Sequence, residues 1–382
     1  MAIVKFGDIV RDVKINVDRA NNPYEHYVAG DHMDSEDLTI HRYGNFETDD
    51  VGPAFTRIFK PGQILYGSRR TYLKKVAVAD FEGICANTTF VLESKDYSLF
   101  DNRLLPFIML SDAFTRWSIA HSKGSTNPYV LFSDLADYEF DLPPIAEQKV
   151  LADKLWAAYR LKESYKKLLT ATEEMVKSQF IEMFGTPENN HNDYPVIKIG
   201  EMVESINYGT SKPATDNGKY VYLRMNNITY DGKLDLSEVK RINLSPEEDD
   251  SAFVHKGDLM FNRTNTKEFV GKTTVFNLDE QMVVAGYIIK VRFKEKYSPE
   301  YVSGYLNSTY GKALLRKMAK GAVHQANINA QEFQGIQVLD VPKQEQDKYV
   351  TIAKQADKSG FELRKSIVSI DKVIKSLINE NI

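Results

Sequence analysis

The sequence predicts an α+β protein made of two similar α/β domains and two long helices that pack against each other, with approximate two-fold symmetry. Three observations lead to this fold class. The chain contains an internal repeat, each copy begins with a strand-rich stretch, and each copy closes with a long run of helical periodicity. A repeat of nearly 200 residues is long enough to be a whole domain with its own helix.

The repeat is clearest where each helical run begins. The pattern Pro-x-x-Glu-Gln at 144–148 returns at 342–346, so that 198 residues separate the two prolines and also the two glutamates. The segment 5–10 returns as 198–203, at a separation of 193 residues. A separation that drifts by a few residues is what loop insertions within two copies of one unit produce.

Before its helical run, each copy predicts mainly strands. From residue 3 to about 142, and again over 194–341, short runs rich in β-branched and aromatic residues are bounded by Gly, Asn and Asp. One helix interrupts each copy, near 101–121 and near 299–320.

The two helical runs have the spacing of a coiled coil. Leu363, Ile367 and Ile370 follow each other in alternating steps of four and three, and the run over 146–184 has the same rhythm. The run of 39 residues would extend about 60 Å as an ideal helix, more than a small domain needs. We therefore predict a pair of spacer helices. The alternative is that each helix packs only on its own domain.

Composition places the chain among soluble globular proteins, with 42% hydrophobic and 27% charged residues. The single cysteine, Cys85, excludes an internal disulfide framework and a thiolate-rich zinc site, and we expect a cytoplasmic location. Neither a signal peptide nor a membrane span is expected. The net charge of −4 argues weakly against a free-standing nucleic-acid binder, although acidic clusters can hide local basic surfaces.

The sequence contains no familiar catalytic motif. It has neither a Walker phosphate loop nor a dinucleotide-binding glycine motif, and the Asn-Pro-Tyr segments at 22–24 and 127–129 are interpreted as turns. His121 and His324 lack partners at metal-ligand spacing, so no metal site is predicted. We therefore expect a chain without catalytic residues of its own.

Basic, amide and aromatic residues cluster in the loops of both copies, at matching points but with different side chains. Arg and Lys can pair with phosphates, and Arg, Asn and Gln can read base edges in a major groove. Two domains that recognise different DNA sequences would share a scaffold and differ in their loops. The predicted DNA-binding residues are Arg57, Arg69, Arg70, Tyr72, Lys74, Lys75, Lys123, Ser125, Asn127, Arg224, Asn226, Asn227, Arg263, Asn265, Lys267, Lys320, His324 and Gln325.

Over nearly its whole length the chain resembles the specificity (S) subunit of type I restriction-modification systems. The likeness is strongest in the segment 142–148 and the end of the first long helix, 180–185, and in the second Pro-x-x-Glu-Gln pattern at 342–346. In that family such a pattern opens a conserved helix after each target-recognition domain. The second copy has Val341 where the first has Pro143.

The resemblance implies two α/β target-recognition domains separated by two antiparallel coiled-coil helices, each domain reading half of a split site in double-stranded DNA. The implied bounds are 1–145 and 186–342 for the domains and 146–185 and 343–382 for the helices. The implied partners are two methyltransferase (modification) subunits and, where restriction occurs, the restriction and translocase subunits. S-adenosylmethionine and ATP would belong to those partners. The partner-binding residues expected on the helices are Glu147, Gln148, Glu345, Gln346, Leu363, Ile367 and Ile370.

Two other functions remain open at this stage. A coiled-coil scaffold that binds only proteins would explain the helices without DNA binding. An enzyme of unusual fold, such as a nuclease with carboxylates dispersed in the sequence, would cleave DNA by itself in a metal-dependent reaction.

Overall fold

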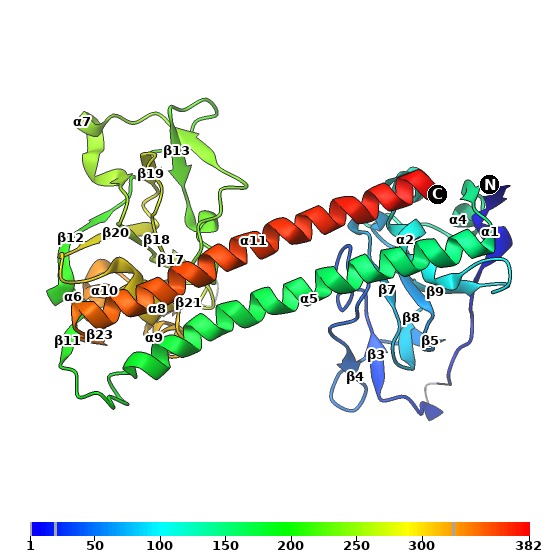
Figure 1. Cartoon of the computed structure of the whole chain (residues 1–382), viewed down its shortest axis with the longest axis horizontal. Helices are drawn as coiled ribbons and strands as arrows, with labels where there is room; N and C mark the ends of the chain where they lie inside the picture. The colour runs from blue at the N-terminus through cyan, green and yellow to red at the C-terminus, as the bar shows by residue number, and fades with distance from the viewer. Residues whose placement is uncertain (1, 19–20, 323–324) are drawn as a thin grey trace. The chain divides into compact units, whose positions relative to one another are not determined.

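A computed structural model describes residues 2–18, 21–322 and 325–382. The chain folds into two units. Unit 1 comprises Met1–Tyr165 and Lys365–Ile382, and unit 2 comprises Lys166–Arg364. Each unit contains one globular domain and a segment of each of two long helices, α5 and α11 (Figure 1).

Unit 1 is built on two four-stranded sheets, in the orders β2-β9-β6-β7 and β4-β3-β8-β5, and a two-stranded sheet in which β1 pairs antiparallel with β10. Its strands are β1 (Ala2–Lys5), β2 (Val10–Asp12), β3 (His26–Val28), β4 (Gly44–Asn45), β5 (Phe55–Phe59), β6 (Ile64–Gly67), β7 (Val76–Val78), β8 (Gly83–Ala86), β9 (Thr89–Ser94) and β10 (Glu139–Leu142). Its helices are α1 (Phe6–Ile9), η2 (Thr71–Leu73), η3 (Asn102–Leu104), α2 (Leu105–Leu110), α3 (Asp112–Ala120) and α4 (Phe132–Ala136).

Unit 2 repeats this plan with sheets in the orders β12-β20-β16-β18 and β14-β13-β19-β15, a β11-β23 pair and a three-stranded sheet, β17-β22-β21. Its strands are β11 (Val196–Lys198), β12 (Val203–Tyr208), β13 (Tyr220–Leu223), β14 (Lys240–Ile242), β15 (Phe253–Val254), β16 (Leu259–Asn262), β17 (Thr264–Asn265), β18 (Thr273–Val275), β19 (Met282–Val284), β20 (Ile288–Phe293), β21 (Lys320–Ala322), β22 (Gln325–Asn327) and β23 (Gln337–Leu339). Its helices are α6 (Ile199–Met202), η4 (Met225–Asn227), α7 (Pro246–Asp249), η5 (Asp250–Ala252), α8 (Pro299–Asn307), α9 (Thr309–Met318) and α10 (Ala330–Gln334).

The two units share their strand pairing as well as their element order. The β3–β8 pair of unit 1 and the β13–β19 pair of unit 2 are both parallel, whereas the neighbouring pairs in these sheets are antiparallel. A parallel pair within a mainly antiparallel sheet needs a crossover connection, and both units make it at the same place. The repeat predicted from the sequence is therefore a repeat of fold.

The helix predicted in the middle of each domain is two helices. In unit 1, Ser111 separates α2 from α3, and its hydroxyl accepts a hydrogen bond from the Phe114 N–H. Ser308 does the same between α8 and α9, where it accepts from the Gly311 N–H. A serine that caps a new helix also ends the previous one, because its own backbone is extended. The helical ranges were predicted correctly, but the breaks were not.

The long helices are α5 (Ile145–Phe184), of 40 residues, and α11 (Lys343–Asn381), of 39 residues. In unit 1 the start of α5 lies beside the end of α11, where Lys162 Nζ and Asp371 Oδ1 form an ion pair of 2.6 Å. In unit 2 the end of α5 lies beside the start of α11, with an ion pair between Glu173 and Arg364. The two contacts make the helices antiparallel.

The long helices pack both against each other and against the domains, so each of the two predictions made from the sequence holds in part. The residues of α5 at four-three spacing, which form its seam, are all buried or half-buried, as that spacing predicts: Leu151, Leu155, Ala158, Lys162, Tyr165, Leu169, Thr172, Val176, Gln179 and Met183. The helix ends also enter the domain cores, with Leu151 and Leu155 in the core of unit 1, and Phe180 and Phe184 in that of unit 2. Each long helix is therefore part of a coiled coil and part of two domains.

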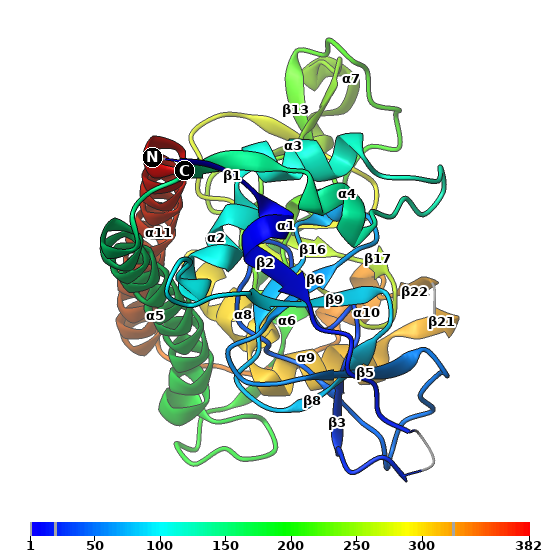
Figure 2. The ribbon, with the colours of Figure 1, turned by 90° about the vertical axis from the view of Figure 1, so that its right-hand side faces the viewer.

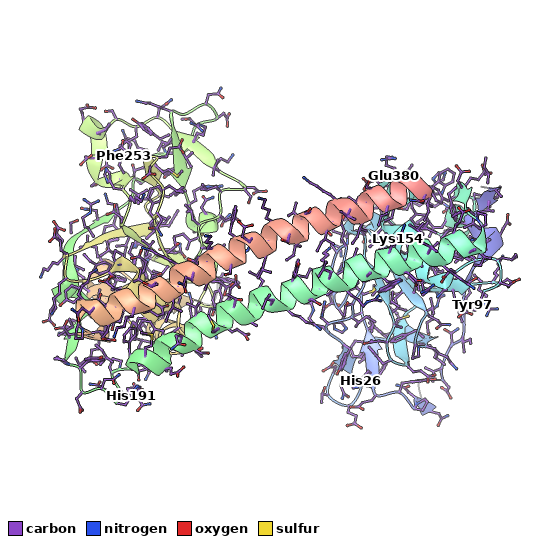
Figure 3. The ribbon with its side chains drawn as sticks, in the orientation of Figure 1. His26, Tyr97, Lys154, His191, Phe253 and Glu380 are labelled. Carbon is purple, nitrogen blue, oxygen red and sulfur yellow. The ribbon has the colours of Figure 1, made fainter. Side chains whose placement is uncertain are left out.

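Charged residues occupy the outer faces of the long helices, among them Lys154 on α5 and Glu380 on α11, which are both exposed (Figure 3). Within the part of the chain that the structure describes, none of the helices combines the length and the apolar composition of a membrane span.

Candidate nucleic-acid interface

In unit 1, two of the predicted loop clusters form one small backbone ladder. Tyr129 pairs antiparallel with both Arg69 and Lys123. The Arg70 N–H donates to the Pro128 carbonyl oxygen over 2.7 Å, and Lys123 and Tyr129 exchange backbone hydrogen bonds of 2.7 and 2.9 Å. The segments 68–72 and 122–130 thus lie side by side, and we call them platform 1.

Platform 1 presents its polar and aromatic side chains to solvent. Arg69, Arg70, Tyr72, Lys123, Ser125 and Asn127 are all exposed. Tyr72 is 53% exposed, and Tyr129, which was not among the predicted residues, is 40% exposed. Large aromatic side chains usually leave water, so two exposed tyrosines among cations indicate a surface made for contact.

The backbone of platform 1 is constrained. Arg70 and Lys74 flank the short helix η2 and have φ angles of 50° and 47°. Residues other than glycine rarely adopt this left-handed conformation, which costs about 1–3 kcal/mol and persists only where surrounding contacts enforce it. Such positions concentrate at functional sites, and here the turn fixes the direction in which Arg70 and Tyr72 leave the loop.

Other cations near platform 1 are engaged within the protein. Lys74 Nζ lies 3.1 Å from Glu36 and 2.9 Å from Asp112. Burial lowers the pKa of Lys74, but its hydrogen bonds to Asp112 and Glu36 outweigh burial, so the pKa is raised. Lys75 Nζ donates to the Gly30 carbonyl oxygen. Lys74 and Lys75 therefore hold the loop after β3 in place and are not open phosphate ligands.

Arg57 does not belong to the surface either. It is 9% exposed in β5, and its guanidinium donates to Asp12 Oδ1 and to the Thr89 carbonyl oxygen, each over 3.0 Å. Burial raises the pKa of Asp12 in spite of this pairing. We therefore remove Arg57 from the predicted DNA-binding set, because its charge neutralises a buried carboxylate in the core.

Lys123 is the cation of platform 1 with an acidic neighbour. Its Nζ lies 3.0 Å from Asp134 Oδ2. Burial raises the pKa of Asp134, but the hydrogen bonds from Lys123 and the Leu131 N–H outweigh it, so the pKa lies below its usual value. Half of the Lys123 side chain is exposed, so the ammonium can reach a phosphate while this pair remains.

In unit 2 the equivalent ladder is the sheet β17-β22-β21, which we call platform 2 (Figure 2). Asn327 pairs with both Thr264 and Lys320, as Tyr129 pairs with Arg69 and Lys123 in platform 1. Asn327 Nδ2 donates to Thr264 Oγ1 over 2.8 Å. The two platforms thus share a backbone frame, while an amide and a hydroxyl replace an aromatic ring and a guanidinium.

Aromatic rings also support platform 2. The Arg263 guanidinium lies over the Tyr208 ring, 4.8 Å from its centroid, and Tyr208 Oη accepts a hydrogen bond of 3.1 Å from the Ala330 N–H. Tyr208 is 42% exposed and Tyr287, beside Arg263 through a backbone hydrogen bond of 2.9 Å, is 51% exposed. Neither tyrosine was predicted. Each lies next to a glycine, Gly209 or Gly286, and this neighbour is the sequence signal that could have marked them as candidate surface residues.

The remaining predicted residues of unit 2 divide between surface and framework. Asn226 and Lys267 are exposed, and Arg224 is half-buried. Asn227 is 2% exposed and caps η4, with its side chain donating to the carbonyl oxygens of Asp235 and Glu238, so we remove it from the DNA-binding set. Asn265 Nδ2 donates to Asn262 Oδ1. For Lys320 and Gln325 only the backbone, on β21 and β22, is described, and His324 lies outside the described residues.

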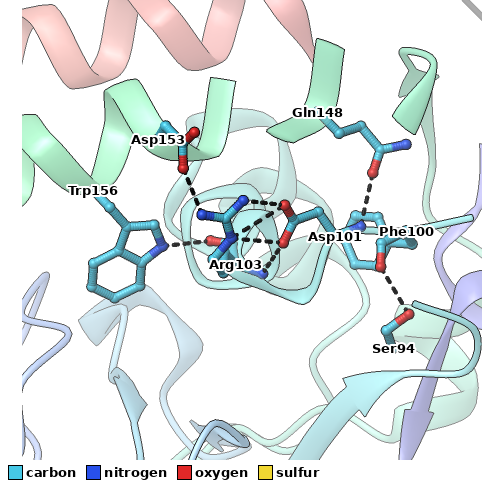
Figure 4. A network of polar contacts seen from close by, with 7 residues as sticks. All are labelled: Ser94, Phe100, Asp101, Arg103, Gln148, Asp153 and Trp156. Carbon is cyan, nitrogen blue, oxygen red and sulfur yellow. Dashed lines mark hydrogen bonds and ion pairs between the residues drawn. The ribbon is translucent and has the colours of Figure 1, made fainter. Parts of the chain in front are cut away.

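The glutamines of the two Pro-x-x-Glu-Gln patterns anchor the long helices. Gln148 is 1% exposed, and its Oε1 accepts from the Asp101 N–H over 2.9 Å (Figure 4). Its Nε2 donates to the Leu99 and Pro143 carbonyl oxygens. Gln346 is 0% exposed and makes the same three kinds of contact, with Ser298, Lys296 and Val341. A buried side chain with all its hydrogen bonds made inside the unit does not bind a partner, so we remove both glutamines from the partner-binding set.

The other predicted partner-binding residues lie nearer the surface. Glu147 is exposed, while Glu345 is half-buried and lies 2.7 Å from Lys348 Nζ. Leu363, Ile367 and Ile370 are half-buried on α11.

Unit 2 also contains a cavity of about 280 Å³ between α5, α11, α8 and the loop 231–234. Its walls are joined by ion pairs, between Lys177 and Asp231 at 2.6 Å and between Lys233 and Asp357. Opposite charges therefore connect this loop with both long helices.

Among the described residues, one group has the spacing of metal ligands, namely Asp37, His41 and Glu163 in unit 1. Sequence reasoning missed it because Glu163 lies on α5, more than 100 residues after the other two.

Comparisons with known proteins identify the family. The model of the type I restriction modification DNA specificity domain matches the chain twice, over residues 22–173 and 191–369. The chain is similar to the type I restriction enzyme EcoKI specificity subunit of Escherichia coli K12, at 21% identity over 291 residues that cover 69% of this chain and 62% of that protein. The chain spans between 32% and 62% of the length of the curated relatives it matches.

Two solved structures have the same fold. One is the S subunit of the type I restriction-modification system from M. genitalium, with a TM-score of 0.56 and 13% identity over 98% of this chain and 95% of that one. The other comes from work on complex assembly and conformational transition of the type I R-M system, with a TM-score of 0.58 and 17% identity over 100% of this chain and 97% of that one. Together with the doubled family match, the two platforms and the shared fold lead to one conclusion: the chain belongs to the type I restriction-modification DNA specificity domain family.

Proposed function

We propose that this chain is the non-catalytic specificity subunit of a type I restriction-modification complex, in which each unit reads one half of a bipartite target in double-stranded DNA. The observation that carries the proposal is the pair of platforms, which share a backbone ladder and differ in the side chains on it. A constant frame fixes how a loop approaches the duplex, and different side chains give each unit its own sequence preference.

Platform 1 supports phosphate contact and base reading together. Arg69, Arg70 and Lys123 supply exposed positive charge, and Asn127 supplies an amide that can bond to an adenine edge. Tyr72 and Tyr129 offer apolar faces for base or sugar contact. In platform 2 the corresponding roles pass to Arg263, Lys267 and Asn327.

Exposed apolar residues on the long helices support partner docking. Leu161, Leu168 and Met175 follow one another at intervals of seven on α5 and are 45%, 52% and 48% exposed. Phe361 and Val368 have the same interval on α11 and are 63% and 54% exposed. Residues seven apart share one helix face, so these form apolar stripes outside the seam. We propose that two modification subunits bind there.

The chemistry in this proposal belongs to the partners. The modification subunits would bind S-adenosylmethionine and transfer the methyl group, and restriction subunits, where present, would use ATP. This chain selects the DNA site. Because its target would be the DNA of its own cell and of entering phage, we expect it to act in the cytoplasm.

The test is DNA binding by the chain co-purified with its modification subunit. The variant R69A/R70A/K123A removes three exposed cations of platform 1, and R11A is the matched control, since Arg11 lies on β2 and pairs with Glu93. Fluorescence anisotropy at several salt concentrations should show weaker binding and a smaller salt slope for the triple variant, by roughly 0.9 for each phosphate that the variant no longer neutralises, and no change for R11A.

Methylome mapping tests the bipartite reading. In cells that express both subunits, methylated adenines should define a split motif, and T264A/N327A should relax only the half that unit 2 reads. If the complex binds all DNA sequences equally and the triple variant matches R11A in affinity and slope, the chain is a protein scaffold and not a sequence reader. Metal-dependent cleavage of DNA by the chain alone would instead make it a nuclease.

A further inference from the structure

The loop after β3 meets helix α5 in unit 1 at a junction that gathers two carboxylates and an imidazole. Asp37, His41 and Glu163 each bring one ligand-type atom within 4.8 Å of those of the other two. His41 Nε2 lies 3.4 Å from Asp37 Oδ2. The 3.4 Å between His41 and Asp37 is close to the separation of neighbouring ligand atoms around one metal ion, given metal–ligand distances of about 2.0–2.2 Å.

Hydrogen bonds fix the orientation of the Asp37 carboxylate. Its Oδ1 accepts from Tyr159 Oη over 2.7 Å and from the Thr39 N–H over 3.0 Å. Tyr159 Oη itself accepts from the Leu38 N–H over 2.9 Å, so the phenol is also held in place. With Oδ1 engaged, Oδ2 points to the His41 side. Supporting hydrogen bonds of this kind orient ligating carboxylates in metal sites.

The repeat provides an internal comparison for this junction. Glu36, with φ of 54°, and Gly232, with φ of 78°, mark the same turn in the two units, so Asp37 corresponds to Lys233. On the helices, Gln148 corresponds to Gln346, so Tyr159 corresponds to Asp357. In unit 2, Lys233 and Asp357 form an ion pair that closes the junction.

The same junction in unit 1 has a different set of side chains. Where unit 2 joins loop to helix through a cation and an anion, unit 1 brings together an imidazole and two carboxylates, with Glu163 at the position of Phe361. Asp37 is 7% exposed, so this ligand is held inside the unit. A metal ion bound there would join the loop to α5, as the Lys233–Asp357 ion pair joins loop and helix in unit 2.

We propose that Asp37, His41 and Glu163 bind a divalent transition-metal ion, Zn²⁺ or Mn²⁺, that clamps the loop after β3 to α5. A mixed set of one imidazole and two carboxylates suits these ions, whereas an imidazole ligand does not suit Mg²⁺ or Ca²⁺. His41 is 41% exposed in its side chain, so the site is open to solvent and water completes the coordination. Metal binding stabilises unit 1 by mass action, because the three ligands come together only in the folded chain.

The experiment is isothermal titration of the tag-free, chelator-treated full chain with ZnCl₂ and with MnCl₂. One of the two metals should bind with a stoichiometry of one and raise the thermal unfolding midpoint. H41N and E163Q should each weaken that binding by at least about tenfold and remove the thermal shift. The control is H255N, since His255 lies 3.8 Å from Asp258 in unit 2 and belongs to no three-ligand group among the described residues.

Two results would overturn the site. One is the lack of stoichiometric binding for both metals, and the other is unchanged binding in both H41N and E163Q. Circular dichroism checks that each variant is folded. E163Q keeps the shape of the side chain, so it decides the question if H41N proves unstable. DNA affinity is measured separately, so failure of this site leaves the proposed DNA-reading function untouched.

Discussion

The anchor at the start of α5 makes a quantitative prediction for the variant Q148A. Gln148 is fully buried and makes three hydrogen bonds of 2.8–3.0 Å, to the Asp101 N–H and to two backbone carbonyl oxygens. Each such bond contributes about 1 kcal/mol net, and the variant leaves its backbone partners buried without the side chain. The expected loss in the free energy of unfolding is therefore about 3 kcal/mol, or a fall of roughly 6–12 °C in the unfolding midpoint of a unit of this size.

Tryptophan fluorescence during urea unfolding measures this loss in unit 1, which contains Gln148. The chain has two tryptophans, Trp117 and Trp156, and both lie in unit 1. Trp156 Nε1 donates to the Arg103 carbonyl oxygen close to the anchor (Figure 4). The control K154A removes an exposed side chain from the same helix and should change stability by less than about 0.5 kcal/mol. If Q148A and K154A unfold at the same urea concentration, the anchor does not stabilise unit 1 and the reasoning fails.

Three further predictions concern the framework around the site. R57M should destabilise unit 1 by about 3–5 kcal/mol, because it leaves the Asp12 carboxylate buried without the Arg57 guanidinium. Chemical denaturation measures this loss. A change below about 1 kcal/mol would show that Arg57 is not part of the core and could bind DNA. G304A should destabilise unit 2 by about 1–3 kcal/mol, since its Cβ would lie 2.4 Å from Tyr349 Oη. Because both tryptophans lie in unit 1, circular dichroism during denaturation is the measurement, and an unchanged unfolding curve would show that Tyr349 moves aside without cost. The hydrogen bond from Lys74 holds the pKa of Asp112 in the folded protein below its usual 3.8. This pair should therefore stabilise the fold above about pH 4, and the stabilisation should be lost as the pH falls through the folded-state pKa of Asp112. D112N should flatten this part of the curve of stability against pH, and an unchanged curve would show that the pair does not cause the pH dependence.

Local pattern and internal repetition predicted much of this structure. The four-three spacing of apolar residues and the Pro-x-x-Glu-Gln pattern placed both long helices within a residue or two of their observed bounds. The runs 76–78 and 220–223 are strands β7 and β13. The clusters around Arg69 and Lys123 were both predicted, but their meeting in platform 1 depends on backbone pairing through Tyr129, which the sequence did not predict.

The errors have a common physical origin. Arg57, Asn227 and Gln148 are polar residues whose burial depends on partners distant in sequence, such as Asp12 for Arg57. A polar residue in a loop-like stretch looks the same in the sequence whether it binds an external phosphate or satisfies an internal backbone group. Tyr208 and Tyr287 were missed for the opposite reason, since aromatic residues within strand-like runs usually pack inward and these two are exposed.

The antiparallel course of α5 and α11 has a consequence for biosynthesis. Ile374, Leu377 and Ile378 close the same core as Phe6 and Phe107, although more than 250 residues lie between them in the chain. Multidomain proteins commonly fold from the N-terminus as the ribosome produces them. Here the domain made first cannot finish its interior until residues 374–378 have emerged, so the nascent chain must keep an open apolar groove throughout translation of unit 2. Chaperones that hold exposed apolar surface should therefore bind this polypeptide late in synthesis and release it when α11 docks.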